Sequence, residues 1–155
     1  MPAVENPYYI VVLLADIEQT LAEIYRAYAR DFPEMAAFWS RLADDELRHG
    51  EWVKDLLENL RIGLLEAEGS RTNYEMYEEY VTYLQHEATA AQKGRLTLLQ
   101  ALHSAELYEK TYLEKNIIHV FTTESAGVQK VLQRLVDETE RHYQAVLAEL
   151  KRREG

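Results

Sequence analysis

Apolar residues recur at steps of three and four along almost the whole chain. This spacing places apolar side chains on one face of an α-helix, whereas no segment alternates apolar and polar residues for long enough to predict a strand. All three prolines lie at or before residue 33, so proline interrupts no later segment. The pattern therefore predicts an all-α protein.

Four main helices and a long connection follow from this pattern. The connection covers about 63–94, and most of it, about 72–92, is itself expected to be helical. A helical hairpin, a long crossover and a second hairpin are the connectivity of one kind of four-helix bundle. The four main helices are expected over residues 8–30, 33–62, 95–121 and 124–152.

Ionisable residues interrupt the apolar face of each main helix. They are Glu18 in the first, Glu46 and His49 in the second, Glu109 in the third and His142 in the fourth. In an antiparallel hairpin, residues equally far from the turn lie at the same height, because each residue rises by about 1.5 Å. Glu18 and Glu46 are centred on residue 32, and Glu109 and Thr139 on residue 124. The polar residues of each hairpin should therefore face each other near mid-length.

Two similar segments, DDELRH at 44–49 and DETERH at 137–142, contain the candidate histidines. The spacing of Glu46 and His49 puts both on one helix face, within reach of one ion. Inward glutamates and Glu-x-x-His pairs form di-metal sites in four-helix bundles. The second segment has Thr139 where a second bridging glutamate would complete the set. Glu138, four residues before His142, is a candidate to replace it.

The expected metal follows from the ligand types. Oxygen and nitrogen donors suit iron or manganese, with zinc as an alternative, and an intact site would hold two ions. The chain contains no cysteine, which excludes disulfides and thiolate-bound metal within it.

Composition narrows the function further. A formal net charge of -10 argues against partners that are nucleic acid or an anionic membrane surface. The 155 residues, 47% of them hydrophobic, suit a single domain over 1–155. The apolar run at 8–14 is stopped by Asp16 and Glu18, so we expect neither a signal peptide nor a membrane span, and a cytoplasmic protein.

Four segments carry a resemblance to a known family: IEQTLAEIYRAYA at 17–29, LADDELRH at 42–49, ALHSAELYEK at 101–110 and DETERHY at 137–143. With them the chain resembles the ferritin-like superfamily, most closely its rubrerythrin-related branch. The resemblance implies a ferritin-like bundle that binds two irons and reacts with peroxide or dioxygen as a peroxidase or oxidase, or oxidises ferrous iron. It assigns the metal ligands to Glu18, Glu46, His49, Glu109 and His142. It also makes Glu106, three residues before Glu109, a second candidate to replace the carboxylate missing at Thr139. Because the chain has no cysteine-ligated iron domain, a separate electron-donor protein is implied.

Two other interpretations remain open. In one, the bundle is a degenerate ferritin-like scaffold that acts as a homodimer or partner-binding module, and its buried acids pair with His49, His142 or Arg48. In the other, Glu18, Glu46 and His49, with His142 as a further ligand, hold a single metal. Tyr25 and Tyr112, close to the acids, are the better redox candidates among the tyrosines, although core packing is the commoner use of such residues. The spacing of Tyr74, Tyr77, Tyr80 and Tyr83 predicts the buried side of the crossover helix, and His86, His103 and His119 fall outside the predicted site.

Overall fold

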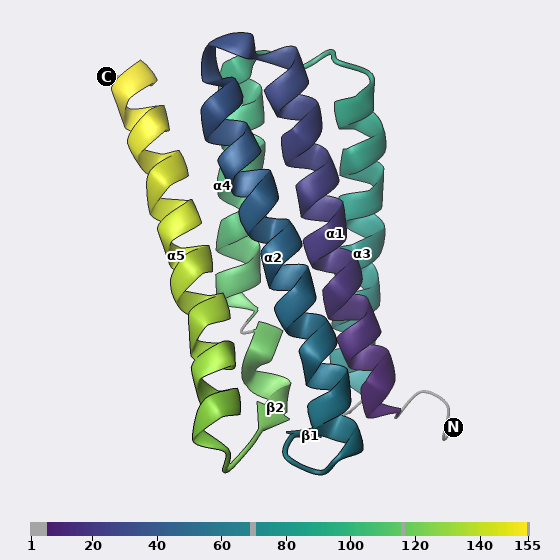
Figure 1. The fold of residues 1–155 in the computed structure, drawn as a ribbon. Coiled ribbons are helices and arrows are strands. Elements are labelled where there is room, and N and C mark those ends of the chain that lie inside the picture. The colour runs from purple at the N-terminus through teal and green to yellow at the C-terminus, as the bar shows by residue number, and fades with distance from the viewer. Residues whose placement is uncertain (1–5, 69–70, 116, 155) are drawn as a thin grey trace.

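Helices α1 and α2 form the first antiparallel hairpin of the protein (Figure 1). The computed structural model describes residues 6–68, 71–115 and 117–154. Helix α1 spans Pro7–Asp31, and Asn6 begins it by accepting a hydrogen bond from the Tyr8 backbone N–H at 3.0 Å. The chain leaves the helix at Phe32, Pro33–Met35 forms a 3-10 turn, and α2 spans Ala36–Arg61. The predicted turn at residue 32 is confirmed.

The remaining helices complete an elongated bundle. Helix α3, Arg71–Gln92, packs against α1 and runs from one end of the molecule to the other (Figure 1). Helices α4, Leu98–Glu114, and α5, Ala126–Glu154, form a second antiparallel pair. Thr97 and Gln100 form a reciprocal capping box at the start of α4, and Gly94, with φ of 65°, reverses the chain after α3. The prediction of an all-α protein is confirmed.

One helix end was predicted incorrectly. The third main helix was expected to reach residue 121, but α4 ends at Glu114. A 3-10 turn, Ile117–Val120, follows, and strand β2, Phe121–Thr122, pairs antiparallel with β1, Glu66–Ala67. The segment is rich in β-branched residues, which favour extended backbone over helix. Its apolar side chains still follow the core, so periodicity alone did not mark the end of the helix.

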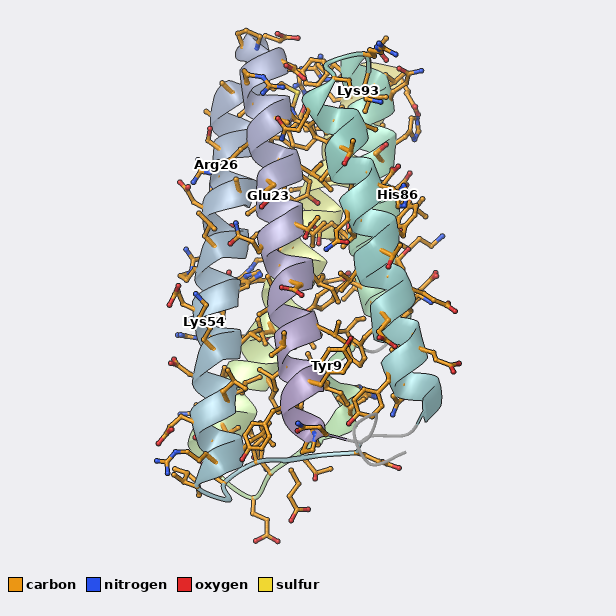
Figure 2. The ribbon with its side chains drawn as sticks, turned by 90° about the vertical axis from the view of Figure 1, so that its right-hand side faces the viewer. Tyr9, Glu23, Arg26, Lys54, His86 and Lys93 are labelled. Carbon is orange, nitrogen blue, oxygen red and sulfur yellow. The ribbon has the colours of Figure 1, made fainter. Side chains whose placement is uncertain are left out.

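The buried faces agree largely with the apolar pattern. Tyr74, Tyr77 and Tyr80 are buried as predicted, whereas Tyr83 is 37% exposed. Steps of three fall short of the 3.6 residues of a helical turn, so the row of tyrosines rotates out of the core. Figure 2 shows the charged residues Glu23, Arg26 and Lys54 on the outer faces of α1 and α2, and His86 on that of α3.

None of the helices in the described ranges is both long enough and apolar enough to cross a lipid bilayer.

Candidate metal centre

The five predicted ligands lie together inside the bundle. Helix α1 contributes Glu18, α2 contributes Glu46 and His49, α4 contributes Glu109, and α5 contributes His142. Each side chain is at most 4% exposed, and Thr139 of α5, at 2%, is buried with them. Carboxylates are rarely buried without a charged partner or a metal. This set of polar residues therefore requires an electrostatic explanation.

The ligand atoms fall into two groups that share one carboxylate. Glu18, Glu46 and His49 form one group, and Glu46, Glu109 and His142 form the other. Within each group, one donor atom per residue lies within 4.8 Å of the others. A carboxylate common to two such groups can bridge two metal ions, because each of its oxygens can bind one ion.

The two histidines direct the same ring nitrogen toward the acids. His49 Nδ1 lies 3.5 Å from Glu46 and 3.7 Å from Glu18, and His142 Nδ1 lies 2.9 Å from Glu46. The opposite nitrogens meet carboxylates outside the cluster. His49 Nε2 lies 2.9 Å from Glu138, and His142 Nε2 lies 3.0 Å from Asp45. Carboxylates in this position fix the tautomer and ring orientation of a metal-binding histidine.

A single arginine connects these two outer carboxylates. Arg48 lies 2.9 Å from Asp45 on its own helix and 2.9 Å from Glu138 on α5. The outer contacts cross between helices, since Asp45 of α2 holds a histidine of α5 and Glu138 of α5 holds a histidine of α2. The imidazole rings lie with their centroids 5.5 Å apart and nearly parallel. The orientation of each ring thus depends on both helices.

Two tyrosines position Glu109 and Glu18 within the buried cluster. The Tyr25 hydroxyl donates to Glu109 Oε1 at 2.6 Å, and the Tyr112 hydroxyl donates to Glu18 Oε1 at 2.8 Å. The other oxygens, Glu18 Oε2 and Glu109 Oε2, and also His49 Nδ1, are buried and have no hydrogen-bond partner among the residues that the structure describes. A buried polar atom without a partner is costly, whereas a metal ion would use these atoms as ligands. The donor set therefore fits one or two divalent ions.

Burial and close charges determine where protons reside in the cluster. Burial, followed by the nearby Glu46, raises the pKa of Glu18 well above its ordinary value. Burial also opposes ionisation of Glu46, but its close contacts with Glu18, His142 and His49 hold its pKa well below the ordinary value. Burial disfavours charged imidazoles, yet the surrounding carboxylates outweigh it and raise the pKa of His49 to about 11 and that of His142 to about 12. In the metal-free protein, bound protons thus compensate the buried negative charge that metal ions would otherwise neutralise.

The two candidates to replace a carboxylate at position 139 lie outside the cluster. The Thr139 hydroxyl donates to the Leu135 backbone carbonyl at 2.7 Å. Glu138 points to the outer nitrogen of His49, and Glu106 lies at the surface, 3.4 Å from His103. Neither glutamate belongs to the two groups of ligand atoms. In the metal-free protein each side chain contacts a histidine instead, so their assignment as substitutes for the bridging carboxylate stays a prediction.

Asp45, and the contact between Glu138 and His49, were not predicted from the sequence. Each of these acids stands four residues before a histidine, Asp45 before His49 and Glu138 before His142. This shared spacing was a usable signal. It could not reveal that each acid contacts the histidine of the other helix, because that contact depends on how α2 and α5 pack.

Comparisons of the chain with protein-family models, with curated proteins and with solved structures give no significant match.

Proposed function

We propose that this protein is a ferritin-like four-helix bundle that holds two iron or manganese ions and acts as an oxidoreductase. It would reduce peroxide or dioxygen with electrons from a separate donor protein, or it would oxidise ferrous iron. The observation that carries the proposal is the shared position of Glu46 in two buried groups of ligand atoms. A single structural ion pair would need only one such group.

Each residue has a defined role in this proposal. Glu18 and His49 would hold one ion, Glu109 and His142 the other, and Glu46 would bridge them. Redox-active ions with open coordination positions supply binding and reduction of an oxygen species. The protein contributes a dry, rigid site, since Tyr25 and Tyr112 fix the carboxylates by hydrogen bonds.

Position 139 is the expected place for an open coordination site. A threonine that donates to its own helix leaves the ions without a second bridging carboxylate from α5. On that side no protein carboxylate would compete with an oxygen substrate. This arrangement favours turnover over tight storage of iron, because fewer protein ligands hold the metal.

Rapid mixing of the Fe(II)-loaded protein with hydrogen peroxide or with dioxygen tests the oxidoreductase proposal. We expect Fe(II) oxidation to be faster than that of free Fe(II) at the same pH, and to be lost in Glu46→Gln. Glu51→Gln changes an exposed acid on the same helix and is the matched control. Equal rates for the wild type and Glu46→Gln would refute the proposal.

A second candidate is a degenerate scaffold that acts through its surface. It is favoured by the close contacts that already pair the buried acids with imidazoles, such as Glu46 with His142 at 2.9 Å. This interpretation expects Glu46→Gln and His49→Gln to leave partner binding intact. It also expects no change in melting temperature on addition of metal ions or chelators.

A further inference from the structure

A surface pocket lies between α2 and α5, on the outer side of His142. Its volume is about 380 Å³, and His142, which is 4% exposed, is among the residues that line it. Pockets of a few hundred Å³ are the size that small organic ligands occupy. The Nδ1 atom of the same histidine faces Glu46, so one imidazole separates this pocket from the cluster of acids.

The pocket is positively charged in a protein that is strongly negative overall. Three arginines, Arg41, Arg48 and Arg141, line it together with two carboxylates, Asp45 and Glu138. One positive charge is therefore in excess before His142 is counted, whereas the whole chain has a net charge of -10. A local excess of the opposite sign favours an anionic ligand at this place.

The two carboxylates are already engaged at short distances, whereas Arg41 and Arg141 are not. Asp45 and Glu138 accept hydrogen bonds from Arg48 and also contact the two histidines. Arg41 has no ion pair or hydrogen bond to any residue that the structure describes. Arg141 is 71% exposed and has one distant contact, at 3.7 Å, with Glu138. Guanidinium groups bind carboxylates with paired N–H donors, so Arg41 and Arg141 suit such a ligand.

Apolar side chains form the rest of the lining. These side chains belong to Phe38, Leu42 and Ala145, and Leu42 is only 4% exposed. We propose that this pocket binds a small organic acid. Its carboxylate pairs with Arg41 and Arg141, and its apolar part packs against Phe38, Leu42 and Ala145. The inference does not depend on metal binding, because none of these five residues is a predicted ligand.

Calorimetric titration of the full chain with benzoate, in the presence of a chelator, tests the inference. We expect one benzoate per chain and much weaker binding of benzamide, which has the same shape without the charge. The double variant with Arg41→Gln and Arg141→Gln should lose about tenfold or more in affinity. Arg61→Gln, at the far end of α2, should bind as the wild type does. Benzoate should shift the imidazole NMR signals of His142 but not those of His86, which lies on the outer face of α3 (Figure 2).

Four results would overturn the inference. The first three are a failure of benzoate to bind saturably, equally strong binding of benzamide, and wild-type affinity in the folded double variant. Inorganic phosphate that bound as tightly as benzoate would also overturn it, since the apolar lining would then contribute nothing. Circular dichroism of each variant establishes that a loss of binding does not result from unfolding.

Discussion

Glu46 is the residue on which the proposed centre depends most. Its side chain belongs to both groups of ligand atoms, and close contacts with Glu18 and the two histidines hold its pKa well below the ordinary value, against the effect of burial. Its distance of three residues from His49 identified it in the sequence. The outer contacts of the histidines were not predictable, because they depend on side chains that meet across α2 and α5.

The Tyr25 hydroxyl offers a test of how the buried acids are held. Tyr25→Phe removes the donor to Glu109 Oε1 and leaves that buried carboxylate without a hydrogen bond there. We expect the free energy of unfolding of the metal-free protein to fall by about 1–3 kcal/mol in a urea titration. Tyr8→Phe, at a residue that is 40% exposed, should change it by less than about 0.5 kcal/mol. Equal effects of the two substitutions would contradict this account of Glu109.

Metal uptake should depend steeply on pH. Because the carboxylates raise the pKa of His49 to about 11 and that of His142 to about 12, both imidazoles carry protons at neutral pH in the metal-free protein. A metal ion must displace these protons, so acid opposes binding and alkali favours it. We expect the affinity for Mn(II) or Zn(II) to rise between pH 6 and 8, by about tenfold per pH unit for each proton displaced. A titration in weakly buffered solution should show proton release, and an affinity independent of pH would contradict this description.

At the scale of helices, the apolar period predicted α1, α2 and α3 to within a few residues, and the turn at Phe32 aligned Glu18 with Glu46. The end of α4 was missed, because Ile117, Ile118 and Val120 continue an apolar surface without continuing the helix. The contacts between α2 and α5 were missed as well. Hydrophobic periodicity indicates which face of a helix is buried, but it does not identify the partner of each polar side chain.

The start of α4 should contribute measurably to stability. Thr97 accepts a hydrogen bond from the Gln100 backbone N–H at 3.1 Å, and the Gln100 side chain accepts one from the Thr97 N–H at 2.9 Å. Thr97→Ala should lower the free energy of unfolding by about 1 kcal/mol, measured by urea denaturation. Thr82→Ala, at an exposed position within α3, is the matched control and should leave it unchanged or raise it by up to about 0.7 kcal/mol, because alanine has the higher helix propensity. A Thr97→Ala protein as stable as the wild type would show that the cap does not stabilise α4.

At the scale of the whole molecule, the buried cluster of acids and histidines connects α1, α2, α4 and α5 through side chains of opposite charge. A metal ion that binds only the folded protein stabilises it, and the gain grows with the logarithm of the free ion concentration divided by the dissociation constant. When that ratio is one hundred, the gain is about 2.7 kcal/mol. We expect Mn(II) or Zn(II) to raise the melting temperature by about 5–10 °C, and a chelator to reverse the change. In Glu46→Gln the shift should disappear, whereas in Glu51→Gln it should persist. A shift of the same size in both variants would mean that the ions bind elsewhere.

The two-metal centre is tested most directly by elemental analysis of the purified protein before and after anaerobic loading with Fe(II), with Thr139→Glu measured beside the wild type. We expect about two irons per wild-type chain, since Glu46 is shared by two groups of ligands. We also expect Thr139→Glu to bind the pair more tightly. One iron per chain would indicate a single-metal site, and no iron in well-folded wild-type protein would contradict the account. If Thr139→Glu then bound two, the fold would have retained the geometry of a centre whose chemistry it had lost.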